Sequence, residues 1–482
     1  MRKSISIIVA MSMVLSLCSC GRAEVKTTTA GTAAETKTET EAAVQEKASE
    51  TAVPDVPAVE SGLPEGPVEI QMWTDFNVSE EILQGVIDRF EEAYKNQGYT
   101  VVLDKFAGSD RATKLSLAKE SKTLPALFLS AWFTSADEVH QGNILDIDEI
   151  AQTAKSDIYP SAYDATCING KSYMIGLYQS YFGLLYNADY FKAAGLEEFV
   201  PEDELEIAAW KLSDFQEKIL PALAEQFKGT EKYPLGLFAA SVQADTHMMN
   251  WLSMYGGQMW KDGKSNSGSD ENVIKALNTM KAWTDAAYTN TDVATKDGTE
   301  VMPDFQNQLC AISHGQYTNY VATRGKIDSG EIGKFDVRLA SVPVEDNGTD
   351  RNIMASYIYG ACIMNNGKED EIAVAKEFLR WLLQDQESLT AINTAGTPCF
   401  QSIAKAAEAE HPIYASYEKM SENLWDFTGN VPGFVETRKD LFPAIQSVYS
   451  GEKTAADALA EYSEKANRVI DEYAQNSLVL NP

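Results

Sequence analysis

Basic residues are scarce in this chain of 482 residues. Its 40 lysines and arginines stand against 71 aspartates and glutamates, which gives a net charge of −31. Nucleic-acid binding requires a basic surface that neutralises phosphates, so this balance excludes nucleic acid as a partner. It also disfavours a polyanionic ligand, unless a local basic pocket overrules the overall charge. We therefore expect the ligand to be neutral or cationic.

Metal-ligating residues are also few, with 4 histidines and 6 cysteines in the whole chain. Four of the cysteines lie beyond position 20: Cys167, Cys310, Cys362 and Cys399. None of these four has the C-x-x-C spacing that is typical of zinc sites. We therefore predict no metal site and no cofactor. The spacing leaves open whether any of the four cysteines pair in disulfides or remain as buried thiols.

No apolar run after residue 67 is long enough for a membrane-spanning helix, which needs about 20 residues. A shorter apolar run, Ser4–Leu17, follows a basic start and is typical of a signal peptide. It leads into a segment that resembles a bacterial lipobox and favours Cys20 as the lipidated residue, because Cys18 would follow the bulky Leu17 directly. We expect residues 1–19 to be a lipoprotein signal peptide, with an ordinary secretory signal as the alternative. A lipidated Cys20 would anchor the protein to the lipid bilayer of the cell membrane, on its extracellular face, as in Gram-positive bacteria.

The segment that follows, residues 20–67, contains no aromatic residue and is rich in Thr, Ala, Glu and Lys. Such a composition buries too little apolar surface to offset the entropy lost on ordering. We therefore predict a disordered tether, with a reach of about 40 Å if it behaves as a flexible coil. The 415 residues beyond it are long enough for two lobes.

Strand and helix patterns alternate from residue 68 onward. Val68–Trp73 predicts a first strand, Ser79 is placed to N-cap a helix, and further strands are expected at Tyr99–Leu103 and Leu124–Ser130, with a helix at Ala112–Lys122 between them. This order favours a mainly parallel α/β sheet. Later strands are predicted at Gly170–Gly176, Tyr181–Tyr186, Cys310–Ser313, Val337–Val342 and Ile358–Met364, and helices at Ala188–Ala194, Leu212–Phe227, Val273–Tyr288 and Ile372–Leu383, with two more in Arg438–Gln475.

Two polar residues in the middle of the chain, Asn187 and Asp189, look catalytic in isolation. We expect a structural role instead, in which Asn187 ends a strand and Asp189 caps the following helix. Gly195 would then end that helix. The neighbouring aromatics Tyr181, Phe182 and Tyr186 are expected in the core.

Three motifs in close succession carry a family resemblance: Asn169–Tyr173 (NGKSY), Gly183–Asn187 (GLLYN) and Asp189–Leu196 (DYFKAAGL). Together they match the pattern N-G-K-x-Y…G-L-x-Y-N-x-D-x-F-x-x-A-G-L of the family 1 extracellular solute-binding proteins, which include maltose-binding protein. Weaker matches in the same order are Ile70–Trp73, Leu124–Phe128, Tyr255–Gly257, Cys310–Gly315, Val342–Pro343, Ala375–Leu379 and Gly396–Pro398. The chain departs from the family at Ala126, where an aspartate is usual, and in an acidic insert before Trp210.

The resemblance implies a periplasmic-binding-protein-like α/β fold, in which a hinge of several crossings joins two lobes and the ligand cleft lies between them. It places an N-terminal lobe at 68–178 plus 361–405 and a C-terminal lobe at 179–360 plus 406–482. It further implies a non-enzymatic, monomeric protein that captures a carbohydrate and delivers it to the permease of an ABC importer. Two alternatives stay open: a different solute, such as a peptide, polyamine or metal complex, or an exported glycoside hydrolase using Asp75 and Glu436.

Aromatic and polar residues gather where predicted strands end, which is where open α/β sheets bind their ligands. A sugar ring stacks its C–H face on an aromatic ring and offers its hydroxyls to planar polar groups. The residues that combine these two chemistries make up the predicted ligand site: Trp73, Asp75, Asn77, Trp132, Phe133, Tyr178, Gln179, Ser180, His247, Trp251, Gln316, Tyr317, Tyr357 and Arg438.

Overall fold

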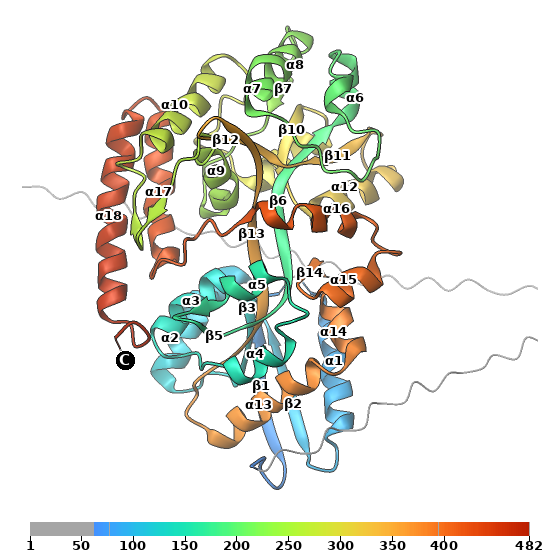
Figure 1. Cartoon of the computed structure of the whole chain (residues 1–482), viewed down its shortest axis with the longest axis vertical. Helices are drawn as coiled ribbons and strands as arrows, with labels where there is room; N and C mark the ends of the chain where they lie inside the picture. Colours follow the sequence, from blue (N-terminus) through green and yellow to red (C-terminus); the bar gives the residue numbers. More distant parts are fainter. Residues whose placement is uncertain (1–61, 77, 394, 482) are drawn as a thin grey trace, which may run out of the picture. The chain divides into compact units, whose positions relative to one another are not determined.

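Two long antiparallel strands, β6 (Ile175–Asn187) and β13 (Thr349–Ile363), run through both halves of the structure (Figure 1). The computed structural model describes residues 62–76, 78–393 and 395–481. The predicted signal peptide, the lipidated Cys20, nearly all of the tether and Asn77 therefore lie outside the described residues. The β6–β13 pair extends from Ile175 opposite Ala361 to Phe182 opposite Ala355, and each strand then joins a different set of neighbours in each half.

The first half, here called the N-lobe, is built on the strand order β2-β1-β3-β13-β6. Strands β1 (Val68–Thr74), β2 (Tyr99–Lys105) and β3 (Leu127–Ala131) are parallel, and β13 joins β3 in antiparallel register. The helices of this lobe are α1 (Glu80–Ala93), α2 (Arg111–Ser121), α3 (Trp132–His140), α4 (Asp148–Ala154), α5 (Pro160–Ala165), α13 (Glu369–Leu382) and α14 (Gln386–Asn393). The predicted alternation is confirmed here, including the N-cap of α1, where Ser79 accepts the Ile82 N–H at 3.2 Å.

The second half, here called the C-lobe, surrounds the other end of β6, which lies between β10 (Cys310–Gly315) and β11 (Val337–Ala340). β7 (Tyr233–Leu235) pairs with β10, and β12 (Val342–Asp346) and β15 (Leu424–Trp425) pair with β13. The helices are α6 (Ala188–Ala193), α7 (Leu212–Asp214), α8 (Leu220–Gln226), α9 (Asp245–Leu252), α10 (Glu271–Asp285), α11 (Gly298–Gln306), α12 (Tyr317–Asp328), α16 (Ile413–Lys419), α17 (Phe434–Tyr449) and α18 (Ala455–Gln475). A further helix, α15 (Gln401–Ala407), bridges the lobes, with Ile403 in the N-lobe core and Ala407 in a C-lobe cluster.

Short elements complete the fold. The strands β4 (Cys167–Ile168) with β5 (Lys171–Ser172), and β8 (Trp260–Lys261) with β9 (Lys264–Ser265), form two small hairpins, and β14 (Thr397–Pro398) pairs with β6. The four cysteines left open by the sequence are free thiols, and three of them are buried. Among the residues that the structure describes, no helix is long and apolar enough to cross a membrane.

The structure corrects three local predictions. The segment expected as one strand at Gly170–Gly176 is divided between β5 and the start of β6. β6 then continues without a break through Tyr181–Tyr186, because β13 and the C-lobe strands give it partners along its length. The segment Val337–Val342 is divided between β11 and β12. The predicted helix at Leu212–Phe227 contains a π-helical stretch at Phe215–Ile219.

The cap of α6 is also different from the expectation. Asn187 itself is the N-cap, because its side-chain oxygen accepts the N–H groups of Asp189 at 3.0 Å and Tyr190 at 3.3 Å. The Asp189 carboxylate instead accepts the backbone N–H of Asp336 at 3.0 Å, which ties α6 to the chain before β11. Both residues are thus structural, as expected, but with different tasks.

The C-terminal segment returns to the N-lobe after the two predicted helices, α17 and α18 (Figure 1). Ser477 is buried, and its hydroxyl lies 2.9 Å from Nδ1 of His140 at the end of α3. The Leu478 N–H donates to the His140 carbonyl at 2.8 Å. The lobes are therefore connected both by the β6–β13 pair and by this terminal contact.

Candidate functional site

A small cavity lies between the lobes, beside the β6–β13 pair. The N-lobe contributes Trp132 and Phe133, which begin α3 at the carboxyl end of β3. The strand pair contributes Gln179 and Tyr357, so four of the predicted site residues meet here. The C-lobe contributes a segment that follows β15, with Trp425, Asp426 and Thr428. The cavity volume is about 60 Å³.

A stack of rings and charges joins the two lobes at this cavity. The ring of Phe133 stacks on that of Tyr357 with centroids 4.6 Å apart, and the Arg438 guanidinium lies 5.1 Å from the Phe133 centroid. On the C-lobe side, the Tyr357 hydroxyl donates to the Asp245 carboxylate at 2.6 Å. Arg438 pairs with the same carboxylate at 2.8 Å, and the two side chains are only 9% and 1% exposed. Burial and the nearby Asp245 raise the pKa of Tyr357 well above its usual value, so its hydroxyl stays a donor.

A second group of polar and aromatic residues lies on the N-lobe side of the β6–β13 pair. Asp75 follows β1 and forms an ion pair with Arg111, while its other carboxylate oxygen has no hydrogen-bond partner among the described residues. Tyr359 stacks on Tyr178 with centroids 4.9 Å apart. Burial raises the pKa of Tyr359, and the carboxylates of Asp75 and Asp245 raise it further, so groups from both lobes act on this one hydroxyl.

The loop after β15 supplies the remaining polar groups. The Trp132 indole N–H donates across the lobes to Asn430 at 2.9 Å. The Asp426 carboxylate accepts the Thr428 N–H at 2.9 Å and the Thr428 hydroxyl at 2.5 Å. Burial raises the pKa of Asp426 despite these donors, although part of its surface remains open to the cavity. Carboxylate and amide oxygens thus border the aromatic rings.

The structure places several predicted site residues away from the cavity. Trp73 is 7% exposed inside the N-lobe, where Lys114 lies over its ring. Trp251 is completely buried and stacks on Phe215 in the C-lobe core. His247 is buried against Phe238, and Gln316 is the N-cap of α12. Tyr317 is hydrogen-bonded to His411 in a separate C-lobe cluster. Ser180 lies on β6 opposite Tyr357.

The sequence did not lead us to four polar residues that line the cavity or bond to predicted site residues: Arg111, Asp245, Asp426 and Asn430. A weak signal existed for two of them. Arg111 follows the end of β2 by six positions, so the same strand-end rule that selected Asp75 applies to it. Asp245 lies two positions before the predicted site residue His247. Asp426 and Asn430 lie in a loop far along the chain, which only tertiary folding brings to the cleft.

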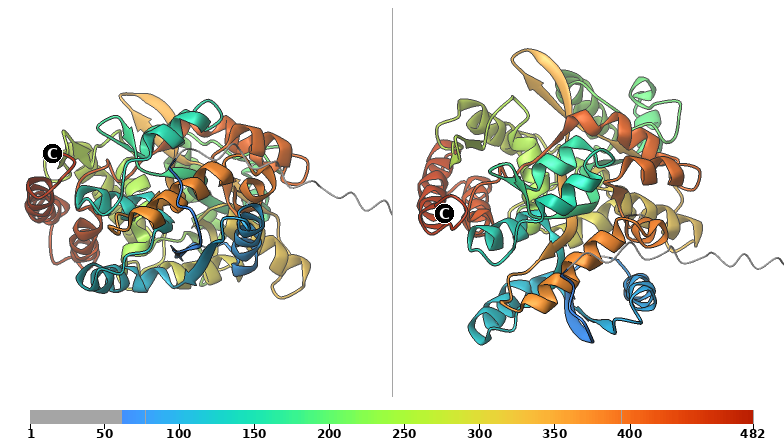
Figure 2. Two further views of the ribbon diagram at one scale, coloured as in Figure 1. Left: turned by 90° about the horizontal axis from the view of Figure 1, so that it is seen from below. Right: turned by 60° about the horizontal axis from the view of Figure 1, so that its bottom comes forward.

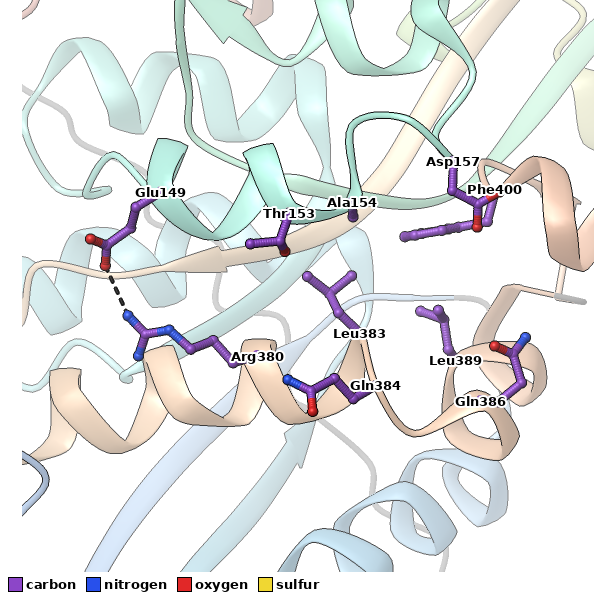
Figure 3. Close-up of a pocket in the computed structure, with 10 residues that line it drawn as sticks. All are labelled: Glu149, Thr153, Ala154, Asp157, Arg380, Leu383, Gln384, Gln386, Leu389 and Phe400. Carbon is purple, nitrogen blue, oxygen red and sulfur yellow. Dashed lines mark hydrogen bonds and ion pairs between the residues drawn. The ribbon is translucent and has the colours of Figure 1, made fainter. Parts of the chain in front are cut away.

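A larger cavity of about 500 Å³ lies within the N-lobe, between α4 and the α13–α14 corner (Figure 3). An ion pair between Glu149 and Arg380, at 2.9 Å, borders one end of it. Its aromatic residue, Phe400, is 2% exposed, and none of the cleft residues line it. In the part of the chain that the structure describes, no group of acidic, histidine or cysteine residues could hold a metal ion. The interlobe cleft therefore remains the candidate site.

Comparisons with known proteins agree with this architecture. The profile of the family described as bacterial extracellular solute-binding protein matches residues 77–388. Similar solved structures include a solute-binding protein of Thermotoga lettingae bound with α-D-tagatose (16% identity, TM-score 0.63, covering 83% of this chain and 99% of that one). Another is an ABC substrate-binding protein of Listeria monocytogenes in complex with cycloalternan (17%, 0.64, 84% and 99%). A third is maltose-bound MalE3 of T. maritima (14%, 0.63, 83% and 98%). No curated protein sequence matches this chain.

Proposed function

This chain belongs to the bacterial extracellular solute-binding proteins, and we propose that it captures a carbohydrate for an ABC importer. The observation that carries the proposal is the cleft in which the Phe133–Tyr357 stack meets the Asp245–Arg438 pair. Aromatic rings offer a face to the C–H groups of a sugar, and fixed carboxylates accept its hydroxyls. The sugars named for the similar structures support the same ligand class.

Capture would proceed by hinge motion around β6 and β13. The residues on the two sides of the cavity belong to different lobes, so a ligand that touches both stabilises the closed arrangement. In the state described here, Trp132 and Asn430 already make a direct contact across the lobes. A ligand must separate or replace such contacts, and the closed surface around it would then be presented to membrane permease subunits, most simply by a monomer.

A ligand screen tests the carbohydrate proposal. A soluble form beginning near residue 62 is mixed with neutral mono- and oligosaccharides, and with peptides and polyamines as competing classes. A sugar present at 100 times its Kd is expected to raise the free energy of unfolding by about 2.7 kcal/mol, measured as a shift in Tm. Stabilisation by a peptide or polyamine alone, with every sugar inert, would replace carbohydrate by that class.

The hydrolase alternative lacks a specific supporting observation. The two carboxylates considered for it are each engaged with a cation: Asp75 with Arg111, and Glu436 with Lys439 at 2.6 Å. A glycosidase requires two carboxylic groups that face one substrate bond from about 5–9 Å apart. Incubating the screened oligosaccharides with the protein and measuring reducing ends checks the point directly.

We further propose that Cys20 is lipidated and that residues 20–67 tether the lobes outside the cell membrane. The basis is the lipobox-like segment and the composition of the tether. In a Gram-positive host, the full chain is expected in the membrane fraction, while Cys20→Ala releases it to the medium or leaves its signal uncleaved. Cys18→Ala is the matched control and should remain membrane-bound and lipid-labelled. A Cys20→Ala chain that still incorporates labelled fatty acid would contradict the assignment.

A further inference from the structure

A groove on the C-lobe opens next to the interlobe cavity. We call it the C-lobe groove; it lies between the segment Gly256–Asp262 and the hairpin formed by β12 and the start of β13, which projects from the ribbon in Figure 2. Gly256 has a φ of 73°, and a Cβ there would lie 2.6 Å from the Asp346 carboxylate. Glycine at this position therefore allows the hairpin tip to approach the loop. The Glu345 N–H donates to the Met254 carbonyl at 2.8 Å and fixes the approach.

Two residues, Trp425 and Asp426, line both the interlobe cavity and the C-lobe groove. The two spaces differ greatly in size: about 60 Å³ for the cavity and about 580 Å³ for the groove. Sites for small organic ligands usually measure roughly 300–1,000 Å³. The groove has this size as it stands, whereas the cavity must open to admit even a single sugar ring.

Two tryptophans give the groove the character of a sugar-binding surface. The Trp260 indole N–H donates to the Phe427 carbonyl at 2.8 Å, and the Trp425 indole N–H donates to Asn250 at 2.8 Å. Both N–H groups are thus satisfied by the protein, while both side chains remain partly exposed. Rings held in this way lose little conformational freedom when a ligand packs on them.

From these observations we propose that the C-lobe groove is an accessory subsite, which holds the outer units of an oligosaccharide whose inner unit enters the interlobe cavity. The inference rests on the proposed carbohydrate function and specifies its substrate class as a chain of several sugar units. Trp425 would contact both the inner and the outer part of the ligand, because it borders both spaces.

The polar rim of the groove suits neutral sugars. Asp346 and Arg351 face each other across the hairpin at 3.3 Å and are 37% and 50% exposed, so both can turn toward hydroxyl groups. Asp262 and Asp426 add carboxylates, against one further cation, Lys261. With three carboxylates and two cations along the lining, the groove offers little attraction to a polyanionic glycan.

The test is the dependence of affinity on ligand length. Calorimetry on gluco-, galacto-, manno- and xylo-oligosaccharides of one to six units is expected to show affinity rising at least tenfold between the shortest and the longest bound member of one series. Trp260→Ala should remove that gain and leave the affinity for the shortest bound member within twofold of wild type. Arg351→Ala should lower the affinity for the long member by a few fold, while Arg324→Ala, a similarly exposed arginine in an ion pair, is the matched control.

Oxidative footprinting on the unmodified protein gives a result that does not depend on the folding of any variant. The long member is expected to protect Trp260 from oxidation, and the short member is not. Equal affinity along the series, or an equal loss for short and long members in Trp260→Ala, would overturn the subsite. If no sugar binds the wild-type protein at all, the proposed function fails, and the subsite fails with it.

Discussion

Replacing Arg438 by alanine is expected to lower the free energy of unfolding by about 3–5 kcal/mol. The change removes the cation that pairs with Asp245, whose side chain is 1% exposed in the intact protein, and leaves the Tyr357 hydroxyl and the Thr246 N–H as its donors. An isolated buried charge is costly because no water replaces the lost partner. Urea denaturation followed by far-ultraviolet circular dichroism measures the loss.

Two further variants separate the charge from the packing at this position. Arg438→Lys keeps the positive charge but loses the planar group that lies 5.1 Å from the Phe133 centroid and 5.9 Å from the Phe434 centroid. We expect it to recover only part of the stability. The double variant Asp245→Asn with Arg438→Met removes both charges together and should recover most of it, since the uncompensated carboxylate is gone. If Arg438→Ala lowers the free energy of unfolding by less than about 1 kcal/mol, the buried Asp245 carboxylate does not need its ion pair with Arg438.

Local sequence patterns predicted the elements well wherever the pattern and the final contacts are near each other in the chain. The N-cap Ser79 and the break between α17 and α18 both depend on residues within one or two turns. The β6 strand shows the opposite case. Its Gly183 lets Ala340 of β11 come close, because a Cβ at position 183 would lie 2.6 Å from the Ala340 carbonyl oxygen. With such distant partners the strand continues through a segment that the sequence pattern divides in two.

For the candidate site too, the sequence predicted the features that depend on nearby residues and missed those that depend on distant ones. The rule that ligands bind after strand ends selected Trp132 and Phe133, which line the cavity, and Asp75, which lies near Tyr359. It also selected Trp73, which lies within β1, before the strand ends, and is buried in the N-lobe with Lys114 over its ring. Asp245 was missed because its role depends on Arg438, almost two hundred residues later. No local pattern encodes a pairing of that range.

The pH dependence of stability is expected to change strongly in Asp137→Asn. Asp137 lies in α3 of the N-lobe, is 8% exposed, and accepts the backbone N–H of Gly433 at 2.7 Å just before α17 of the C-lobe. Burial raises its pKa to about 7, against the opposing effect of backbone donors, while the nearby carboxylates of Glu138 and Glu436 raise it further. In the unfolded chain the same group titrates near pH 4.

Between these two values the folded protein binds a proton that the unfolded chain does not, so stability falls as the pH rises from 4 to 7. The full difference corresponds to roughly 4 kcal/mol. Asp137→Asn has no such proton to lose, and we expect it to match wild type near pH 4 and to exceed it by up to this amount at pH 8.

The measurement is the difference in the free energy of unfolding between variant and wild type at several pH values. Taking the difference cancels the contribution of other groups that titrate in the same range, such as His140, whose pKa burial lowers. Asp137→Ala serves as the second variant, since it also removes the acceptor for Gly433 and should be less stable than Asp137→Asn at every pH. A difference that does not vary with pH would show that the carboxyl of Asp137 has the same pKa in the folded and the unfolded protein. A difference that rises as expected would show that the ionised carboxyl is costly to bury between α3 and α17, and that the Gly433 N–H offsets only part of this cost.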